Sequence, residues 1–325
     1  MRLLITGGCG FIGSNFIHFM LERYKDARVI NLDKLTYCGN PENLNDVSSD
    51  MRYSFVKGDI CDRDLVEDLM TDVDTVINFA AETHVDRSIK YPDDFLMTNV
   101  FGVKTLLEAA RKAGVARFIQ IGTDEIYGSV DEGLSREGDP LKPNSPYSAT
   151  KAAADMLALS YHATYGLPVV VIRSSNNFGP YQYPEKIIPL FITDLLEDRK
   201  VSLYGDGGNV RDWLFVKDNC AGIDLVLRRG KPGQIYNIGG GCCLSNLELT
   251  GKILSVMGKG KESIEYVNDR PGHDRRYALD SSRVKELGWA PEAGFDRNLE
   301  ETVRWYGENG DWWRPLRDKA EIIEW

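Results

Sequence analysis

The sequence predicts an α/β protein, a doubly wound parallel sheet with a second, smaller, mixed α/β lobe. Three observations lead to this fold class. Short apolar runs alternate with helix-like stretches through the first half of the chain, which is the pattern of a parallel sheet covered on both faces. The nearly continuous apolar run VVVI at 169–172 suits a strand buried on both faces. After Arg173 the composition changes, as a second lobe would require.

The elements of the first half follow from these runs. Strands are predicted at 2–6, 29–33, 53–57, 75–79, 117–122 and 169–173, and helices at 14–24, 63–70, 93–113 and 147–165. Strands and helices that alternate at this spacing are typical of βαβ units.

Proline and glycine mark the start of the second lobe. They concentrate at Pro180, Pro184, Pro189, Gly205, Gly207 and Gly208. One more strand-like run, 234–239, is predicted to return to the sheet. We therefore expect two interleaved units, residues 1–175 with 212–239 and residues 176–211 with 240–325. The sequence contains no internal repeat or low-complexity segment.

The composition restricts the possible partners. The 325 residues are 42% hydrophobic and 27% charged, which are values of a globular protein that folds in water. Lys and Arg number 39 against 49 Asp and Glu, a net charge of −10. An acidic surface disfavours nucleic acid and anionic membranes as partners. An anionic ligand would therefore need a local basic pocket.

Cysteine usage and the N-terminus favour a cytoplasmic protein. The six cysteines (Cys9, Cys38, Cys61, Cys220, Cys242 and Cys243) are scattered, without a CxxC pair or metal-ligand spacing. We expect reduced thiols and no metal site. The apolar run at the N-terminus is too short for a signal peptide and suits a buried first strand.

A glycine-rich turn joins the first predicted strand to the first helix. Gly7, Gly10 and Gly13 would tighten the turn, let the backbone approach a pyrophosphate, and let the helix pack on its strand. The helix N-terminus then faces the phosphates. Asp33, at the end of the second strand, would accept hydrogen bonds from ribose hydroxyls and repel a 2′-phosphate. This favours NAD over NADP, although the neighbouring Lys34 weakens the preference.

Asp59 follows the third predicted strand and has two interpretations. Its carboxylate would either reach the adenine edge or cap the next helix, since Asp is a preferred N-cap residue. The sequence leaves both open.

Tyr147 and Lys151 lie one helical turn apart on one face of a predicted helix, behind Ser145 as its cap and Pro146 in its first turn. A nearby ammonium favours phenolate, so we expect the pKa of Tyr147 to be lowered toward working pH. The phenolate would take a proton from a sugar hydroxyl as hydride leaves for nicotinamide.

Thr123, Asp124 and Glu125 follow directly after another predicted strand. Ligands of doubly wound sheets bind at the carboxyl ends of the strands. Two carboxyl groups there would face the chemistry and divide acid and base roles. The alternative is a solvated acidic turn.

At this point the sequence resembles the extended short-chain dehydrogenases and, within them, the dTDP-glucose 4,6-dehydratases. The resemblance covers nearly the whole chain. Its segments are TGGCGFIGS (6–14), NLDKLTYCGN (31–40), AAETHVDRSI (80–89), TDEIYG (123–128), YSATKAAAD (147–155), RSSNNFGPYQYPEK (173–186), NVRDW (209–213), YNIGG (236–240) and DRPGHDRRYALD (269–280). In related epimerases and decarboxylases a small hydroxyl residue usually occupies the position of Asp124. The Asp-Glu pair therefore indicates dehydration.

The resemblance implies roles for the five reaction-centre residues and a Rossmann-like fold. Tyr147, aided by Lys151, removes the proton of the C4 hydroxyl as hydride passes to NAD. Glu125 then removes the C5 proton, Asp124 protonates the leaving C6 hydroxyl, and hydride returns to C6. Thr123 hydrogen-bonds the C4 oxygen. We expect Asp124 to be protonated and Glu125 ionised, because close carboxylates resist joint ionisation.

The resemblance also implies which residues bind the two ligands. The NAD site would contain Gly7, Gly10, Phe11, Ile12, Gly13, Asp33, Lys34, Leu35, Thr36, Asp59, Ile60, Ala80, Ala81, Thr83, Thr98, Tyr147, Lys151 and Asn177. The nucleotide-sugar site would contain His84, Thr123, Asn176, Glu185, Lys186, Ile187, Tyr204, Arg211, Asn246, Arg270, His273 and Arg275. The unit 1–175 with 212–239 would then bind NAD, and the other unit the nucleotide sugar.

Other interpretations stay open. A nucleotide-sugar 4-epimerase would use Tyr147 and Lys151 without the carboxyl pair, and a catalytically silent NAD-binding regulator would need none of the four. Cys9 replaces the more usual alanine, and the Cys242-Cys243 pair has no functional explanation. The choice between dTDP and UDP is not decided by residue identities.

The predicted helices 93–113 and 147–165 are apolar on more than one face, with Leu106, Leu107, Met156, Leu157 and Leu159. A second helical partner would cover the additional face, as in the paired-helix homodimers of similar enzymes. Burial within one subunit is the alternative.

Overall fold

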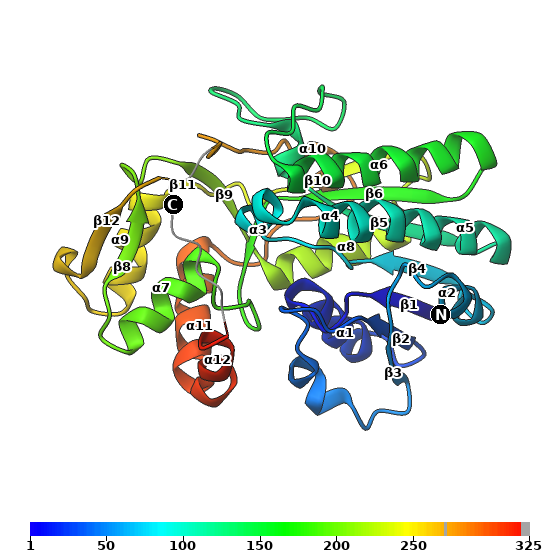
Figure 1. Cartoon of the computed structure of the whole chain (residues 1–325), viewed down its shortest axis with the longest axis horizontal. Helices are drawn as coiled ribbons and strands as arrows, with labels where there is room; N and C mark the ends of the chain where they lie inside the picture. Colours follow the sequence, from blue (N-terminus) through cyan, green and yellow to red (C-terminus); the bar gives the residue numbers. More distant parts are fainter. Residues whose placement is uncertain (270–271, 320–325) are drawn as a thin grey trace.

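The computed structural model describes residues 1–269 and 272–319. Its centre is a seven-stranded sheet in the order β10-β6-β5-β4-β1-β2-β3, and every pair of neighbours is parallel (Figure 1). The strands are β1 (Arg2–Thr6), β2 (Arg28–Asp33), β3 (Tyr53–Lys57), β4 (Thr75–Asn78), β5 (Arg117–Thr123), β6 (Val169–Ser174) and β10 (Ile235–Ile238). This confirms the predicted fold class and the return of 234–239 to the sheet.

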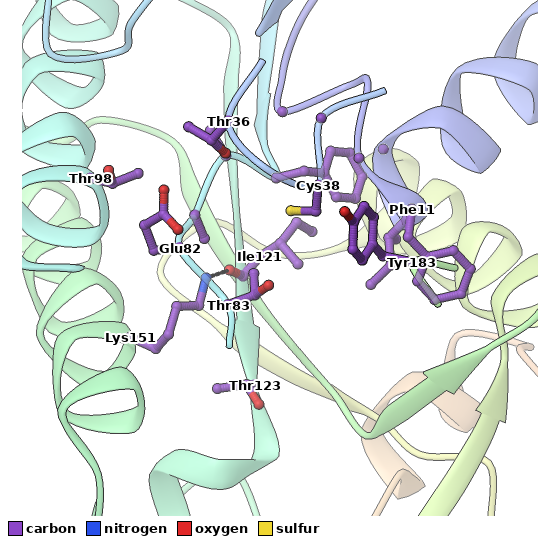
Figure 2. A pocket seen from close by; sticks show the side chains of 18 of the residues that line it. Phe11, Thr36, Cys38, Glu82, Thr83, Thr98, Ile121, Thr123, Lys151 and Tyr183 are labelled. Atoms are coloured by element: carbon purple, nitrogen blue, oxygen red, sulfur yellow. Dashed lines mark hydrogen bonds between the residues drawn. The ribbon is translucent and has the colours of Figure 1, made fainter. Parts of the chain in front are cut away.

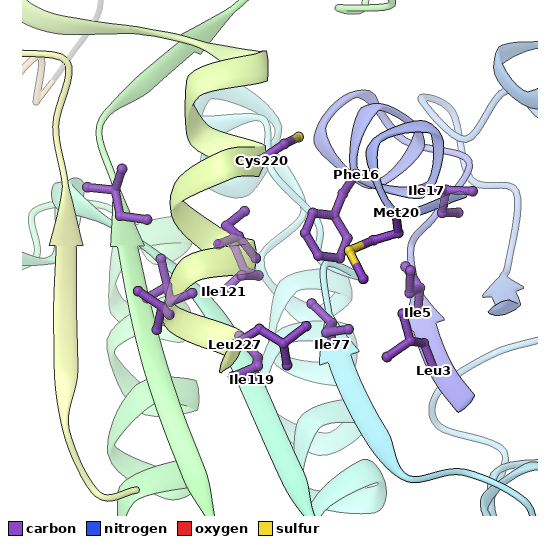
Figure 3. Close-up of a cluster of buried hydrophobic side chains, with 14 of the residues drawn as sticks. Leu3, Ile5, Phe16, Ile17, Met20, Ile77, Ile119, Ile121, Cys220 and Leu227 are labelled. Carbon is purple, nitrogen blue, oxygen red and sulfur yellow. The ribbon is translucent and has the colours of Figure 1, made fainter. Parts of the chain in front are cut away.

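Helices cover both faces of the central sheet. Their bounds are α1 (Phe11–Arg23), α2 (Arg63–Met70), α3 (Val85–Lys90), α4 (Pro92–Leu96), α5 (Val103–Ala113), α6 (Pro146–Tyr165) and α8 (Val216–Arg229). Successive residues of β1 point to opposite faces, as the period of a strand requires. Leu3 and Ile5 pack in the core with α1 and α8 (Figure 3), whereas Leu4 packs in the core with α2, α5 and α6.

One predicted helix is wrong in its interior. The stretch 93–113 is not continuous, because the π-helical segment η2 (Met97–Gly102) separates α4 from α5. Within η2 the buried Asn99 side chain accepts a hydrogen bond from the backbone N–H of Glu82 (2.9 Å) and donates to the Thr150 hydroxyl (3.1 Å). These hydrogen bonds tie η2 to the Glu82 backbone and to α6, and a single helical period does not reveal such a widened turn.

The second lobe is built on two small sheets, β11-β9-β7 and β12-β8. The strands are β7 (Asn176–Phe178), β8 (Val201–Tyr204), β9 (Val210–Phe215), β11 (Cys243–Ser245) and β12 (Ile264–Val267), and the helices are α7 (Ile187–Leu196), α9 (Asn246–Val256), α11 (Phe295–Glu308) and α12 (Gly310–Arg317). The short helix α10 (Ser282–Glu286) instead packs beside β10, and its Val284 belongs to the core of the large sheet. The lobe has its own apolar core, which includes Phe191, Leu249 and Trp313.

The two lobes are connected without a linker at one point. Strand β9 of the small sheet runs directly into helix α8, whose apolar side chains belong to the core of the large sheet.

The described short 3₁₀ turns are η1 (Pro41–Val47), η3 (Asp124–Tyr127) and η4 (Lys261–Ser263).

Three further observations concern the described residues only. No helix among them is both long and apolar enough to cross a bilayer. The same residues bring together no group of three or more His, Cys, Asp or Glu side chains suited to hold a metal. All six cysteines lie within the described ranges and are free thiols.

The core beneath α1 provides a stability prediction. Phe16 is fully buried between the sheet and α8, so Phe16→Ala is expected to lower the free energy of unfolding by about 3–5 kcal/mol. The matched control is Phe55→Ala on the edge strand β3, where the side chain is 40% exposed and the expected change is within about 0.5 kcal/mol. Urea unfolding followed by circular dichroism measures both, and equal losses would contradict the assignment.

Candidate active site

A cavity of about 300 Å³ opens where the central strands end (Figure 2). Residues after β1, β4 and β6 line it together with the last residues of β2 and β5. The second lobe contributes a wall from Asn176 to Lys186. Because all the strands are parallel, their carboxyl ends meet at this one edge.

The glycine turn forms one end of the cavity. Gly7 has φ +68°, and a Cβ there would lie 2.6 Å from the backbone nitrogen of Ala80. A Cβ on Gly13 would lie 2.4 Å from the Gly7 carbonyl oxygen. Gly10 is the N-cap of α1 and supplies no side chain to its first turn. The first N–H groups of α1 therefore face the cavity, an arrangement that suits a pyrophosphate.

Asp33 closes the glycine turn as well as lining the cavity. Its carboxylate accepts hydrogen bonds from the backbone N–H of Cys9 (2.9 Å) and of Leu35 (2.8 Å). Burial raises the pKa of Asp33, and these two hydrogen bonds oppose the rise. Each oxygen keeps a second lone pair for a ligand.

Lys34 and Asp59 lie together at the same end. The Lys34 ammonium pairs with the Asp59 carboxylate at 2.8 Å. The N-cap of α2 is Asp62, which accepts from the N–H of Leu65. The N-cap interpretation of Asp59 is therefore wrong, and the Lys34 charge is already paired.

Tyr147 and Lys151 are buried on one face of α6. The helix begins with Pro146 and a capping box between Ser145 and Ser148, as predicted. The Lys151 ammonium donates to the carbonyl oxygen of Ile121 at 2.5 Å (Figure 2). Burial lowers the pKa of Lys151 to about 8.

The predicted lowering of the Tyr147 pKa is wrong. Burial raises the pKa of this phenol, and the neighbouring charge of Glu125 raises it further, while the Thr123 hydroxyl opposes the rise. Removal from water disfavours the phenolate, because the charged form loses its hydration.

The turn after β5 positions the two carboxyl groups. Thr123 is the N-cap of η3, and its hydroxyl accepts from the N–H of Glu125 (3.3 Å) and hydrogen-bonds Asp124 Oδ1 (3.4 Å). Asp124 is only 3% exposed, and its Oδ2 is buried without a hydrogen-bond partner among the described residues. Burial, followed by the charge of Glu125, raises the pKa of Asp124 well above its usual value. This agrees with the expectation of a protonated Asp124.

The structure brings most of the predicted site residues to this one cavity. All five reaction-centre residues line it. From the predicted NAD site the cavity is also lined by Gly7, Gly10, Phe11, Ile12, Gly13, Asp33, Lys34, Thr36, Asp59, Ile60, Ala80, Ala81, Thr83, Thr98 and Asn177. Leu35 does not line it and instead packs against the core. From the predicted nucleotide-sugar site, Asn176, Glu185 and Lys186 line the cavity.

The remaining predicted substrate residues do not line this cavity. His84 caps α3 and Ile187 begins α7. Tyr204, Arg211, Asn246, His273 and Arg275 belong to the second lobe, and Arg270 lies outside the described residues.

The arginines of the second lobe differ in their surroundings. The Arg211 guanidinium is buried, donates to the carbonyl oxygens of Val210 (2.8 Å) and Asp274 (3.0 Å), and lies 4.4 Å from the centre of the Tyr277 ring. Arg275 forms an exposed ion pair with Asp206 at 2.9 Å. Their roles toward a substrate stay predictions.

Comparison with known proteins identifies the family of this chain. The family model described as GDP-mannose 4,6 dehydratase matches residues 4–302. The chain belongs to this family. It is 51% identical over 325 residues to the dTDP-glucose 4,6-dehydratase of Streptomyces antibioticus, covering 98% of this chain and 96% of that protein.

Solved structures of members and relatives are similar as well. DesIV, the dTDP-glucose 4,6-dehydratase of Streptomyces venezuelae crystallised with NAD and a second ligand, superposes with a TM-score of 0.95 at 52% identity, covering 97% of this chain and 100% of that one. The UDP-glucuronic acid 4-epimerase of Bacillus cereus has a TM-score of 0.90 at 27% identity, covering 95% and 99%.

Several residues that line the cavity were not predicted from the sequence. They are Leu32, Cys38, Gly39, Gly58, Phe79, Ile121, Gly122, Ser174, Ser175, Gln182 and Tyr183. Most flank predicted residues at strand ends, so proximity to those ends was the available signal. Cys38 and Tyr183 had no such signal: Tyr183 packs edge-on against the Tyr37 ring, and the Tyr37 hydroxyl donates to Glu185 at 2.9 Å.

Asp124 provides a prediction about pH and stability. Its pKa is higher in the folded protein than in the unfolded chain, so this carboxyl stabilises the fold less as the pH rises from the unfolded toward the folded pKa. Asp124→Asn removes that cost and is expected to raise Tm by a few degrees at pH 8, and by less at pH 4. Differential scanning fluorimetry at both values measures the effect, and a Tm lower than the parent's at pH 8 would contradict it.

Proposed function

We propose that this protein is an NAD-dependent dTDP-glucose 4,6-dehydratase, a hydro-lyase that converts dTDP-glucose into dTDP-4-keto-6-deoxyglucose and water. One observation carries the proposal. The Asp124-Glu125 pair lines the same cavity as Tyr147 and Lys151. A cavity with both pairs has a base for oxidation at C4 and an acid and a base for loss of water.

The residues present fit NAD. The bare glycine turn leaves room for a pyrophosphate at the N-terminus of α1, and Asp33 faces the cavity with lone pairs for ribose hydroxyls. The pairing of Lys34 with Asp59 supports NAD over NADP, since that cation is already neutralised. When bound, NAD supplies a positively charged hydride acceptor and later a hydride donor.

Oxidation at C4 depends on Tyr147 and Lys151. Tyr147 removes the proton of the C4 hydroxyl as the C4 hydride leaves, and Thr123 hydrogen-bonds the C4 oxygen. Only the phenolate can accept this proton, and burial raises the pKa of the phenol. The Tyr147 proton must therefore leave first, and positive charge nearby, such as the Lys151 ammonium, favours its loss. The product of this step is a 4-ketone.

Elimination then depends on Glu125 and Asp124. The C4 ketone makes the C5 proton acidic, and Glu125 removes it. Asp124, which is kept protonated by its burial, donates its proton to the departing C6 hydroxyl, and water leaves. Glu125 returns a proton to C5 as hydride arrives at C6.

We assign the remaining substrate contacts to the second lobe. Residues 1–175 with 212–239 would hold NAD, and residues 176–211 with 240–325 would hold the nucleotide sugar. Asn176 supports this division, because its Oδ1 is buried and has no hydrogen-bond partner in the described chain. Arg211 supplies a buried guanidinium for the anionic nucleotide, in the way that such groups bind phosphates.

A nucleotide-sugar 4-epimerase is the competing function, because the chain is similar to the UDP-glucuronic acid 4-epimerase of Bacillus cereus. An epimerase needs Tyr147 and Lys151 but no acid-base pair. The burial of Asp124 beside Glu125 is unexplained by epimerisation, since a buried carboxyl group without a role only costs stability.

Incubation with dTDP-glucose, UDP-glucose and other nucleotide glucoses, read by mass spectrometry, tests the proposal. We expect dTDP-glucose to lose the mass of one water. A product of unchanged mass would favour epimerisation, and no turnover with any of them would favour a silent NAD-binding protein.

The matched variant is Glu125→Gln. It keeps the size of the side chain but removes the base, so solvent deuterium is expected to enter C5 at least about 100-fold more slowly. Exchange at the parent rate would show that Glu125 is not the base.

We also propose a homodimer formed through helices, in a cytoplasmic protein. Leu96 on α4, Met97 and Phe101 on η2, and Met156 on α6 are each 44–52% exposed. These elements pack side by side, so the exposed side chains form an apolar surface that a second copy would cover. The six free thiols support a reducing compartment.

The dimer is tested by the double change Phe101→Asp and Met156→Asp. Charges on the apolar surface are expected to convert the dimer into a monomer in light scattering after gel filtration. The control is Met51→Asp, where the side chain is 100% exposed elsewhere on the surface and the dimer is expected to persist. A parent protein that is monomeric at micromolar concentration would refute the proposal.

A further inference from the structure

Three ionisable residues form a buried stripe along α6. Tyr147, Lys151 and Asp155 are spaced four residues apart, so they lie on one face of the helix, one turn after another. Tyr147 and Lys151 line the cavity, whereas Asp155 lies one turn deeper and is 0% exposed. The proposed reaction uses the first two and gives no role to the third.

The Asp155 carboxylate is fixed by one strong contact. Its Oδ2 accepts a hydrogen bond from Arg173 Nε on β6 at 2.9 Å, and the Arg173 side chain is 1% exposed. Its other oxygen, Oδ1, is buried without a hydrogen-bond partner among the described residues. Burial of a carboxylate costs free energy. The cost is larger here because one of the two oxygens has no hydrogen bond to offset it.

The space for this carboxylate comes from Gly122 on β5. A Cβ at Gly122 would lie 2.9 Å from both oxygens of Asp155. Gly122 follows Ile121, whose carbonyl oxygen accepts the hydrogen bond from the Lys151 ammonium. Two consecutive residues of β5 therefore serve the two side chains. The Ile121 carbonyl oxygen contacts Lys151, and Gly122 leaves room for Asp155.

Arg173 also reaches the turn that carries the acid-base pair. Its Nη1 donates to the Tyr127 hydroxyl on η3 at 2.7 Å, and that hydroxyl donates to Asn237 Oδ1 on β10 at 2.9 Å. One buried guanidinium therefore links α6 to η3. This network fixes the Asp155 carboxyl group one turn along α6 from Lys151. Burial raises the pKa of Asp155, and the charges of Arg173 and Lys151 oppose the rise.

The charge at Asp155 has a direct consequence for Lys151. Burial alone disfavours the ammonium, and Asp155 is the group that opposes this effect. The ionisable groups around Lys151 are Tyr147 and Asp155 on α6, Arg173 on β6, Asp124 and Glu125 on η3, and Glu82 on the opposite wall of the cavity. Of these carboxyl groups, Asp155 alone shares the buried stripe of α6 behind the cavity.

We propose that Asp155 is a positioning residue for the reaction: its carboxylate, fixed by Arg173 one helical turn behind Lys151, is the counter-charge for the Lys151 ammonium at the wall of the cavity. The proposal rests on the dehydratase function proposed above. Asp155 touches neither ligand and acts through Lys151. The alternative is a buried ion pair that only stabilises the fold.

Asp155→Asn separates the two interpretations. Without the negative charge the pKa of Lys151 falls, so the high-pH limb of kcat is expected to move down by about one pH unit, with about a fivefold loss of kcat at pH 8. KM for dTDP-glucose is expected to stay unchanged. A lowered Tm together with a parent-like pH profile would overturn the proposal.

The control is Asp194→Asn on α7. Asp194 is a buried partner of Arg199 and Arg317 in the second lobe and lies outside the cavity. Its loss is expected to lower Tm and to leave the pH profile unchanged. Parent protein that forms no 4-keto product would count against the dehydratase function, whereas a parent-like profile in Asp155→Asn would count against Asp155 alone.

A measurement on unmutated protein keeps the proposal falsifiable if Asp155→Asn does not fold. In protein labelled with ¹⁵N at lysine Nζ, the Lys151 signal, assigned by its absence in Lys151→Met, is expected to be that of an ammonium at pH 7 and to titrate near 8. A neutral amine at pH 7 would refute the proposal.

Discussion

Removal of charged groups from water is the physical constraint on which the rest of this site depends. Asp124, Tyr147, Lys151, Asp155 and Arg173 are all buried at the carboxyl ends of β5 and β6. Burial raises the pKa of the acids and lowers that of the lysine, because each group loses hydration in its charged form. The same desolvation favours the protonated form of Asp124, which its proposed role as an acid requires, and it leaves the Lys151 ammonium in need of a nearby counter-charge.

The parallel sheet explains why these groups meet. Every strand of the large sheet ends at the same edge, so residues far apart in the sequence, such as Gly7, Asp33 and Thr123, line one cavity. The turn after β5 and the first turns of α6 then bring two chemically different pairs together. In the proposed reaction, oxidation and loss of water therefore share one site, and the ketone that forms with the help of one pair activates the sugar for the other pair.

Much of this arrangement is readable from the sequence, for physical reasons. Apolar runs such as VVVI at 169–172 are long enough to define buried strands, and the glycine turn and Tyr147 to Lys151 spacing define local geometry that tertiary contacts do not change. The π-helical turn at Met97–Gly102 was not predictable, because it depends on hydrogen bonds of Asn99 to Glu82 and Thr150. The pKa of Tyr147 was predicted in the wrong direction, since a sequence shows a neighbouring lysine but not the extent of burial.

In the proposed reaction, the hydride removed from C4 returns to C6 of the same sugar after water has been lost from C5 and C6. The direct test is dTDP-glucose labelled with deuterium at C4, followed by NMR of the product. The account predicts deuterium in the new C6 methyl group. A 4-keto-6-deoxy product without deuterium in its methyl group would contradict it.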